Sequence, residues 1–302
     1  MKEGAPIETY SLKRVTNLES LWPEIQDFLI KEEATHNLLL GLLVHFVSHP
    51  ESQSEIVYAA VIRDKNQEIV MVALQTENHN VILSQSIDVE PVDLLVKDLS
   101  AVSDRVPGVL GPQALSLRFA SGWHQRTGRR FVVELTERIH ELTEIAIESQ
   151  SLGIIRQVQP EDRDWVMEWL QEFVREALPH QATDALQIAR RSARKIDGLA
   201  REGGFFVLEV DGDPCSLVGY GNPTLNGIRV APVYTPPSAR GHGYATELVR
   251  AVSQNLLNWG YQQVYLFTDL KNLTSNRIYR MVGYRPVADV DSYAFLGDVL
   301  TP

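Results

Sequence analysis

The sequence has 302 residues, of which 44% are hydrophobic and 22% are charged, and its formal net charge is -11. This length allows one large domain or two of ordinary size, and the composition is typical of a globular protein. The acidic charge argues against nucleic-acid binding, which usually requires a basic surface. It favours cationic or neutral substrates instead.

The remaining composition bears on compartment and metal binding. The longest apolar run, over residues 37–47, is about half as long as a membrane span. No apolar core follows the first charge, so we expect no signal peptide. The single cysteine, Cys215, favours a reducing cytoplasm. His45 and His49 are four residues apart, but no glutamate follows the first as in H-E-x-x-H, and we expect no metal. We therefore expect a cytoplasmic monomer or homodimer without membrane or nucleic-acid partners.

In the first half, the spacing of apolar residues predicts helices and strands in alternation. In chain order they are helices over 18–30 and 33–47, a strand pair around a turn at 64–66, a further strand, a helix after Pro91, a short strand, a helix over 113–127 and a strand over 129–137.

The second half shows a clearer pattern of the same kind. The predicted elements are a strand over 152–158, a helix from Pro160 with Trp165, Trp169, Phe173 and Leu178 on one side, a helix from Thr183 to about Glu202, a strand pair around the turn residues 211–213, a strand over 226–234, a helix over 245–259, a strand over 262–269, a helix over 273–282 and a terminal strand pair over 284–297. We therefore expect two copies of one α+β plan, each with a mixed, mostly antiparallel sheet flanked by helices. The boundary near Gln150 gives domains 1–150 and 151–302.

A glycine-rich stretch joins the strand over 226–234 to the next helix. It reads YTPPSARGHGYATELV from Tyr234 to Val249. Backbone amides exposed at a helix start attract anions, glycine lets a ligand approach closely, and Arg240 can contact a phosphate. A tight turn with a surface arginine is the plain alternative. The stretch is not a dinucleotide fingerprint, because Thr246 replaces the third glycine, nor a P-loop, because no Lys-Ser or Lys-Thr follows.

Two motifs resemble the GNAT N-acetyltransferases. Arg240, Gly243 and Ala245 match the acyl-coenzyme A loop of that family, Arg/Gln-x-x-Gly-x-Gly/Ala. The segment NLTSNRIYRMVGY, residues 272–284, resembles the segment after the fifth strand of the family. Residues 154–297 thus resemble a GNAT domain. The first half matches in element order alone and lacks the loop, so the chain resembles tandem GNAT proteins whose N-terminal repeat has lost the site.

The resemblance implies acetyl-CoA as co-substrate and direct attack of an amine on the thioester. The residues that it implies for binding acetyl-CoA are Val233, Tyr234, Arg240, Gly241, His242, Gly243, Tyr244, Ala245, Asn272 and Ser275. It also implies that the strand over 226–234 splays from the strand over 262–269. Tyr279 is the implied general acid, because a phenol is protonated at neutral pH and can donate to the departing thiolate.

The general base is not evident from the sequence, because the strand over 226–234 carries no carboxylate. Asp269 and Glu209 are alternatives that would act through water, although turn or surface roles explain both. Glu172 and Glu176 could face the acceptor pocket, although a solvated helix face is the preferred interpretation.

Three functions remain open at this point. The first is acetylation of a small-molecule amine, and the second is acetylation of a protein lysine or N-terminus. The third is a non-catalytic acyl-CoA sensor, which the lack of a carboxylate on the strand over 226–234 favours. Transfer from aminoacyl-tRNA, known in other tandem GNAT-like proteins, is disfavoured by the acidic charge and by the intact loop.

Overall fold

The computed structural model describes residues 9–103, 105–177 and 203–296, together with residues 188, 189, 192, 193, 196 and 197. The helix expected from Thr183 lies largely outside this part of the chain. Within it, no helix combines the length and the apolar character that crossing a bilayer requires. The chain divides into two compact units, residues 1–138 with 288–302 (unit 1) and residues 139–287 (unit 2).

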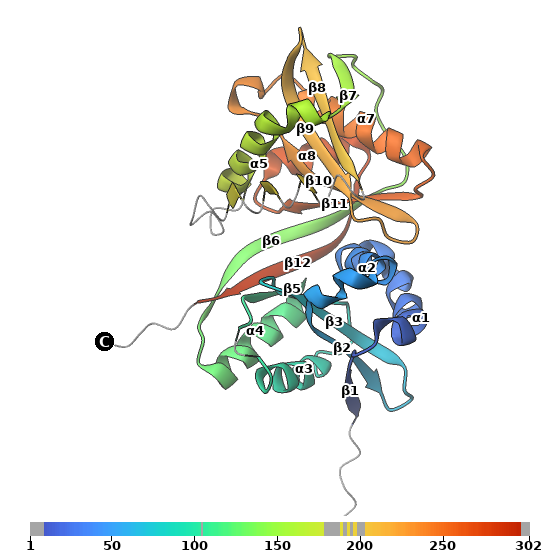
Figure 1. Ribbon diagram of the computed structural model, residues 1–302, viewed down its shortest axis with the longest axis vertical. Coiled ribbons are helices and arrows are strands. Elements are labelled where there is room, and N and C mark those ends of the chain that lie inside the picture. Colours follow the sequence, from blue (N-terminus) through green and yellow to red (C-terminus); the bar gives the residue numbers. More distant parts are fainter. Residues whose placement is uncertain are drawn as a thin grey trace, which may run out of the picture. The chain divides into compact units, whose positions relative to one another are not determined.

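Unit 1 is a sheet with helices on both faces (Figure 1). Its elements are β1 (Tyr10–Arg14), α1 (Leu18–Leu29), a 3-10 turn (Ile30–Glu32), α2 (Glu33–Ser48), a 3-10 segment (Pro50–Glu55), β2 (Ile56–Asp64), β3 (Ile69–Thr76), β4 (Val81–Leu83), α3 (Pro91–Ser100), β5 (Gly108–Pro112), α4 (Gln113–Thr127) and β6 (Phe131–Leu142). Helices α1 and α2 pack on one face, where Leu40 and Val61 are buried, and α3 and α4 on the other, around Trp123. The helices agree with the sequence predictions, whereas the short, largely exposed β1 was not predicted.

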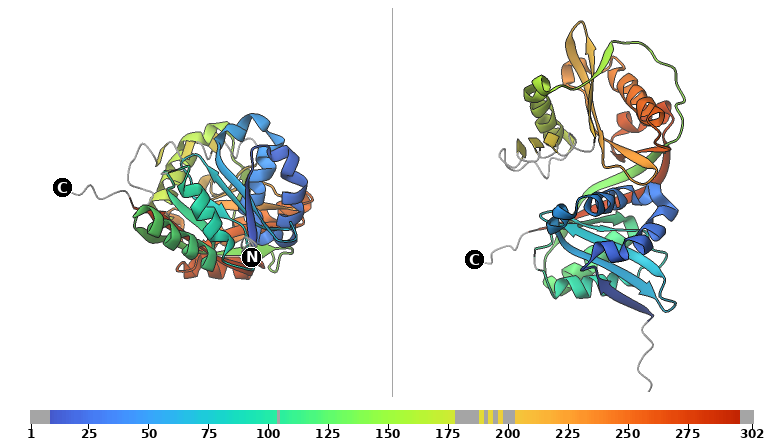
Figure 2. Two further views of the ribbon diagram at one scale, coloured as in Figure 1. Left: turned by 90° about the horizontal axis from the view of Figure 1, so that it is seen from below. Right: turned by 45° about the vertical axis from the view of Figure 1, so that its right-hand side comes forward.

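Unit 2 has the same layered construction (Figures 1 and 2). Its elements are β7 (Ile154–Gln157), a 3-10 turn (Pro160–Asp162), α5 (Arg163–Ala177), β8 (Gly204–Val210), β9 (Asp213–Gly221), β10 (Gly227–Tyr234), a 3-10 turn (Pro237–Ala239), α7 (Tyr244–Asn258), β11 (Gln263–Asp269), α8 (Leu273–Val282) and β12 (Arg285–Phe295). Helices α7 and α8 cover one face of its sheet, and α5 covers the other through the buried Val166 and Leu170. Trp165 and Trp169 are partly buried at the edge of that contact.

The two units repeat one strand plan. In unit 1 the order is β1-β2-β3-β4-β5, with antiparallel neighbours except for the parallel pair β4–β5. Unit 2 repeats it as β7-β8-β9-β10-β11, with β10–β11 parallel. A helix connects the parallel pair in each case, α3 in unit 1 and α7 in unit 2. The sheets are mixed and mostly antiparallel, as predicted.

The last strands depart from the predicted boundary near Gln150. The strand beside β5 is β12, at the end of the chain, and the strand beside β11 is β6. Residues 288–302 therefore belong to unit 1, and the division falls inside β6 and β12. The predicted terminal strand pair is wrong, because β12 is a single strand whose residues 290–294 pair with β5. A boundary drawn along the sequence cannot show which distant strand completes each sheet.

Candidate active site

The parallel ladder between β10 and β11 is short. It runs from the pair Gly227–Gln263 to the pair Arg229–Tyr265, while β10 continues to Tyr234. On the other side of β10, the register with β9 shifts between Val230 and Val233. Beyond Arg229, the edge of β10 that faces β11 is therefore outside the ladder.

The loop from β10 to α7 presents backbone amides to solvent. Gly241 and Gly243 have φ of 85° and 82°, the left-handed region that glycine occupies without strain. Gly243 caps α7, and no side chain caps the helix with it. Within α7 the backbone N–H of Glu247 donates to the Gly243 carbonyl at 3.1 Å. The amides before it are the donors that a helix start leaves without internal acceptors, and the helix dipole adds positive potential there.

The two glycines differ in what surrounds them. A Cβ on Gly241 would meet nothing within 4 Å. A Cβ on Gly243 would lie 3.3 Å from Leu152 Cδ1 and 3.5 Å from Gln150 Oε1. Gly241 therefore faces open space, whereas the side of Gly243 that a side chain would occupy is covered by protein.

A buried carboxylate holds this covering segment in place. Glu247 is 3% exposed and accepts from Ser149 Oγ at 2.6 Å and from the Gln150 backbone N–H at 2.9 Å. Arg250 donates to the same carboxylate at 2.8 Å. Burial opposes ionisation of Glu247, but these donors outweigh it and lower its pKa. Glu247 has no distinguishing signal in the sequence, because a glutamate in a first helical turn is usually a surface residue.

The next two predicted residues of the loop form an aromatic pair. The ring of His242 stacks on that of Tyr244, with centroids 5.3 Å apart and planes 14° apart. His242 is exposed, and Tyr244 and Ala245 are partly exposed. This pair lies at the amide-rich start of α7, so a planar group of a ligand bound there could stack on it.

Arg240 already has a carboxylate partner. Its Nη2 donates to Glu176 Oε2 at 2.6 Å, and its Nε donates to the Thr235 carbonyl at 2.9 Å. The hydroxyl of Tyr234 donates to the other oxygen of Glu176 at 3.2 Å. Burial and the adjacent Glu176 raise the pKa of Tyr234 to about 12. Glu176 thus lies at the end of β10, rather than on a merely solvated helix face.

The other predicted carboxylates have structural partners. Glu209 is paired with Arg156, which also binds Asp162. Asp269 accepts the Lys271 backbone N–H at 2.8 Å in the turn after β11. Glu172 pairs with Arg175 on the exposed surface of α5. Of the four carboxylates considered in the sequence, the structure brings Glu176 to the loop.

Asn272 and Ser275 are engaged with each other at the start of α8. Asn272 is the N-cap, and its Oδ1 accepts the Ser275 backbone N–H at 3.0 Å. A neighbouring residue, Asn276, joins α8 to the end of β11, because it contacts the Thr268 hydroxyl and the Asp269 carbonyl. Asn272 therefore has a clear structural role, and its amide nitrogen is the part left for a ligand.

Tyr279 lies on α8 with its ring in the core of unit 2. It is 7% exposed, and its ring centroid is 5.8 Å from Tyr284 and 6.4 Å from His140. Burial raises its pKa, and no described residue hydrogen-bonds its hydroxyl. By contrast, the hydroxyl of Tyr284 is 2.7 Å from that of Ser253. Tyr279 thus remains protonated at neutral pH and keeps a donor that is not already committed.

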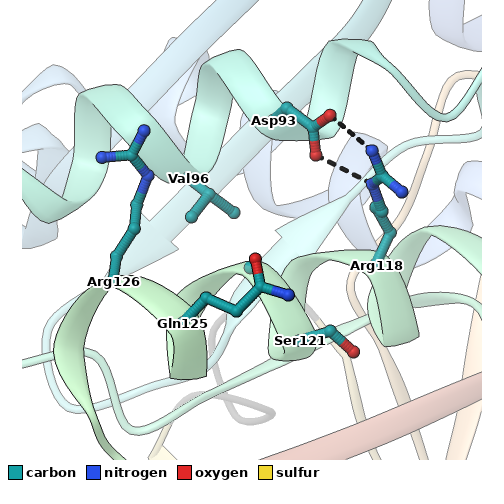
Figure 3. A pocket seen from close by; sticks show the side chains of 7 residues that line it. Asp93, Val96, Arg118, Ser121, Gln125 and Arg126 are labelled. Atoms are coloured by element: carbon teal, nitrogen blue, oxygen red, sulfur yellow. Dashed lines mark hydrogen bonds and ion pairs between the residues drawn. The ribbon is translucent and has the colours of Figure 1, made fainter.

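The pocket in Figure 3 lies elsewhere, between α3 and α4 of unit 1. It has a volume of about 270 Å³, and an ion pair between Asp93 and Arg118 at 2.6 Å closes one side. The start of α3 is acidic, with Glu90 at the cap and Asp93 in the first turn. Asp93 is neutralised by Arg118, and Glu90 at the cap opposes an anionic ligand, so the corresponding helix of unit 1 lacks the properties of the α7 loop.

Comparison with known proteins agrees with this geometry. Residues 164–284 match the family model described as acetyltransferase (GNAT) family. The chain resembles solved structures of a Drosophila protein (TM-score 0.64, 12% identity, covering 94% of this chain and 98% of that one), a GCN5-related N-acetyltransferase from Sphaerobacter thermophilus (0.56, 15%, 95% and 96%) and a GNAT acetyltransferase from Colwellia psychrerythraea (0.54, 13%, 95% and 100%).

A search of curated proteins finds no match to the chain. At the identities of the solved structures, structural likeness shows the fold, and the family rests on the matched residues. Those residues include β10, the α7 loop and α8. Residues 164–284 are therefore similar to the acetyltransferase (GNAT) family, and the chain as a whole shares the fold of the solved structures.

Proposed function

We propose that the protein is an N-acetyltransferase that transfers an acetyl group from acetyl-CoA to the amine of a small molecule. The observation that carries this proposal is the start of α7. There, two left-handed glycines precede a helix start that no side chain caps, and Gly241 faces open space, within the region that matches the GNAT family model. A pyrophosphate is the part of acetyl-CoA that such amides would bind. The proposal also places the protein in the cytoplasm.

The chain's residues divide the work as follows. The amides of residues 241–245 would hold the phosphates, with Arg240 beside them. The edge of β10 beyond Arg229, near Val233, would line the cleft for the thioester. Acetyl-CoA supplies the activated acyl group, and the attacking amine displaces its thiolate through a tetrahedral arrangement. The carbon–nitrogen bond forms as the carbon–sulfur bond breaks, the neutral amine loses one proton to solvent, and the thiolate gains one.

Tyr279 would donate a hydrogen bond to the sulfur of the departing thiolate. Its phenol is protonated at neutral pH, and its raised pKa makes it a hydrogen-bond donor rather than a strong acid. A free thiol has a pKa of about 8.5, so complete transfer from the phenol is uphill unless the thiolate is also desolvated. The same apolar surroundings would desolvate both groups. Donation by the Tyr279 hydroxyl therefore stabilises the thiolate as the carbon–sulfur bond breaks.

A second candidate function is acyl-CoA sensing without catalysis. It is favoured by the sequence of β10, GIRVAPVY, which carries no carboxylate to accept the amine proton. For either function, we propose that the N-terminal unit is a repeat without a CoA site, an interpretation supported by the repeated strand plan and by the acidic start of α3.

One experiment separates the two candidates. Purified protein is mixed with acetyl-CoA and a panel of primary amines, namely spermidine, tyramine, 2-phenylethylamine and glucosamine, and thiol release is followed. Amine-dependent thiol release above the rate in buffer supports the enzyme. Binding of acetyl-CoA without release above the rate in buffer supports the sensor, and no binding of acetyl-CoA contradicts both.

A further inference from the structure

We propose that the carboxylate of Glu176 binds the ammonium group of the acceptor. Before acetyl-CoA binds, Arg240 forms an ion pair with this carboxylate, and the phosphates of acetyl-CoA then compete for Arg240. This inference rests on the proposed function, because it names the acceptor chemistry and the binding order at the same site. It makes the acceptor an amine that binds in its ammonium form, loses one proton to solvent before it attacks, and loses a second as the amide forms.

The surroundings of Glu176 suit a cation. Its two carboxylate oxygens accept from Tyr234 at 3.2 Å and from Arg240 at 2.6 Å. The Arg240 guanidinium carbon lies 6.0 Å from the centre of the Tyr234 ring. A carboxylate beside an aromatic face is a common arrangement for binding ammonium groups. Arg240 therefore supplies the cation that lies beside the Glu176 carboxylate and the Tyr234 ring when no ammonium ligand is bound.

Helix α5 supplies a second aromatic ring to the same place. Trp169 is seven residues before Glu176, so the two share one side of the helix. Its ring meets the Tyr234 ring edge to face, with centroids 5.9 Å apart. Trp169 in turn contacts Trp165, with centroids 4.9 Å apart. This aromatic wall fixes the position of Tyr234, and with it one of the two donors to Glu176.

Arg240 is placed to respond to phosphate. It immediately precedes Gly241, where the exposed amides begin, and its side chain is 48% exposed while that of Glu176 is 41% exposed. An ion pair this exposed is weak, so a doubly charged pyrophosphate can compete for the guanidinium. If Arg240 turns to the phosphates, the carboxylate of Glu176 loses its partner and becomes available to an ammonium group.

Two consequences follow from this competition. Glu176 opposes acetyl-CoA binding, because it must release Arg240 first. Acetyl-CoA in turn favours amine binding, because effects of this kind are reciprocal. The acceptor would therefore bind after acetyl-CoA, and a free amine would bind weakly to the protein alone.

The first test measures the affinity for CoA, used as the probe, by isothermal titration calorimetry. Glu176→Gln should tighten CoA binding by about two- to fivefold, the range expected from releasing an exposed ion pair. Arg240→Ala should weaken it, and in an Arg240→Ala background Glu176→Gln should have no effect. The matched control is Glu172→Gln, one turn earlier and paired with Arg175, which should leave CoA affinity unchanged. Unchanged or weaker binding by Glu176→Gln, or the same gain in the Arg240→Ala background, would overturn the competition.

The second test uses a panel amine that the wild-type protein acetylates. Glu176→Gln should raise its KM at least tenfold, because the variant lacks the charge that holds the ammonium group, whereas Glu172→Gln should not. An unchanged KM would overturn the acceptor role of Glu176. The two failures are distinguishable. A protein that neither binds CoA nor acetylates any amine contradicts the proposed function. A protein that binds CoA and acetylates an amine, but whose Glu176 variants behave like the wild type, contradicts only this inference.

Discussion

Glu247 accepts a hydrogen bond from the backbone N–H of Gln150 at 2.9 Å, and this contact fastens the segment before β7 to the first turn of α7. The same segment covers Gly243 through Leu152. The carboxylate therefore supports the turn that presents the amides of the loop. Glu247 is also a buried charge, and its hydrogen-bond donors offset the cost of removing that charge from water.

Replacing Glu247 by Ala should therefore destabilise unit 2. The change leaves Arg250, whose side chain is 14% exposed, without its buried partner, and the free energy of unfolding should fall by about 3 kcal/mol. Urea unfolding followed by fluorescence measures the change. The control is Glu172→Ala, which removes an exposed pair and should cost about 0.5 kcal/mol. Equal losses in the two variants would show that Glu247 does not hold the segment.

The stability of unit 1 should fall in mild acid. His36 is buried on α2, its Nδ1 is 2.8 Å from the Leu29 carbonyl, and its Nε2 accepts the Gln85 backbone N–H at 3.0 Å. Burial lowers the pKa of His36. A neutral ring is thus favoured in the folded state, whereas the unfolded ring takes up a proton at about pH 6.5.

The sign of this effect is fixed by the lowered pKa. Below about pH 6.5 the unfolded state binds more protons than the folded one, so the free energy of unfolding decreases as pH falls, by at most about 1.4 kcal/mol per pH unit for one histidine. Urea unfolding between pH 7.5 and 5.5 should show the loss, and His36→Gln should remove that slope, while replacing the exposed His79 by Gln should not. An NMR titration that gave His36 a pKa above 6.5 would contradict the assignment.

Substitution of a glycine before α7 should lower the affinity for acetyl-CoA, whereas substitution of an ordinary turn glycine should not. Gly241→Ala places a side chain at φ of 85°, which costs about 1–2 kcal/mol, and relief of that strain would move the amides of the loop. We expect the affinity for acetyl-CoA to fall at least tenfold. Gly243→Val would instead press on Leu152 and Gln150, so Gly241 gives the cleaner test.

The matched control for Gly241 is Gly212. It lies in the β8–β9 turn at φ of 89°, and a Cβ there also meets nothing within 4 Å. Gly212→Ala should lower the free energy of unfolding by a similar amount and leave acetyl-CoA affinity unchanged. Thermal unfolding and calorimetry measure the two quantities. Equal losses of affinity in both variants would mean that strain, and not the loop, determines binding.

Tyr279→Phe should separate catalysis from folding. The hydroxyl has no hydrogen-bond partner among the described residues, so its removal should change the free energy of unfolding little. The rate of acetyl transfer should fall by about 10²-fold, in kcat and kcat/KM alike, because the lost interaction is made in the transition state. Steady-state kinetics and urea unfolding test both expectations.

The neighbouring Tyr284 provides the control for Tyr279. Its hydroxyl shares a hydrogen bond with Ser253, so Tyr284→Phe should lower the free energy of unfolding by about 1 kcal/mol without a comparable loss of rate. If Tyr279→Phe turned over acetyl-CoA at the wild-type rate, water or the amine would supply the proton, and Tyr279 would be a core residue.

Local sequence patterns predicted the elements better than the connections between them. The apolar spacing of residues 245–259 gave the helix α7, and the turn residues 211–213 gave the β8–β9 hairpin, because both depend on neighbours in the chain. The position of β12 beside β5 depends on pairing between distant segments, for which the sequence carries no local signal.

The same distinction applies to the candidate site. The loop from Arg240 to Ala245 was predictable because glycine spacing encodes its conformation directly. The sequence placed Glu176 among the alternatives for the acceptor pocket but could not separate it from Glu172, because its contacts with Tyr234 and Arg240 depend on how α5 packs against β10. Asn272 shows the reverse case, in which a residue matched to a binding motif also serves as a helix cap.

The most direct test of the account is the stoichiometry of acetyl-CoA binding by isothermal titration calorimetry. The loop before α7 has left-handed glycines and free amides, whereas the start of α3 carries Glu90 and Asp93. We predict one acetyl-CoA per chain, with binding greatly weakened by Gly241→Ala and unaffected by Gly212→Ala. Two equivalent sites per chain, or no binding at all, would contradict the account.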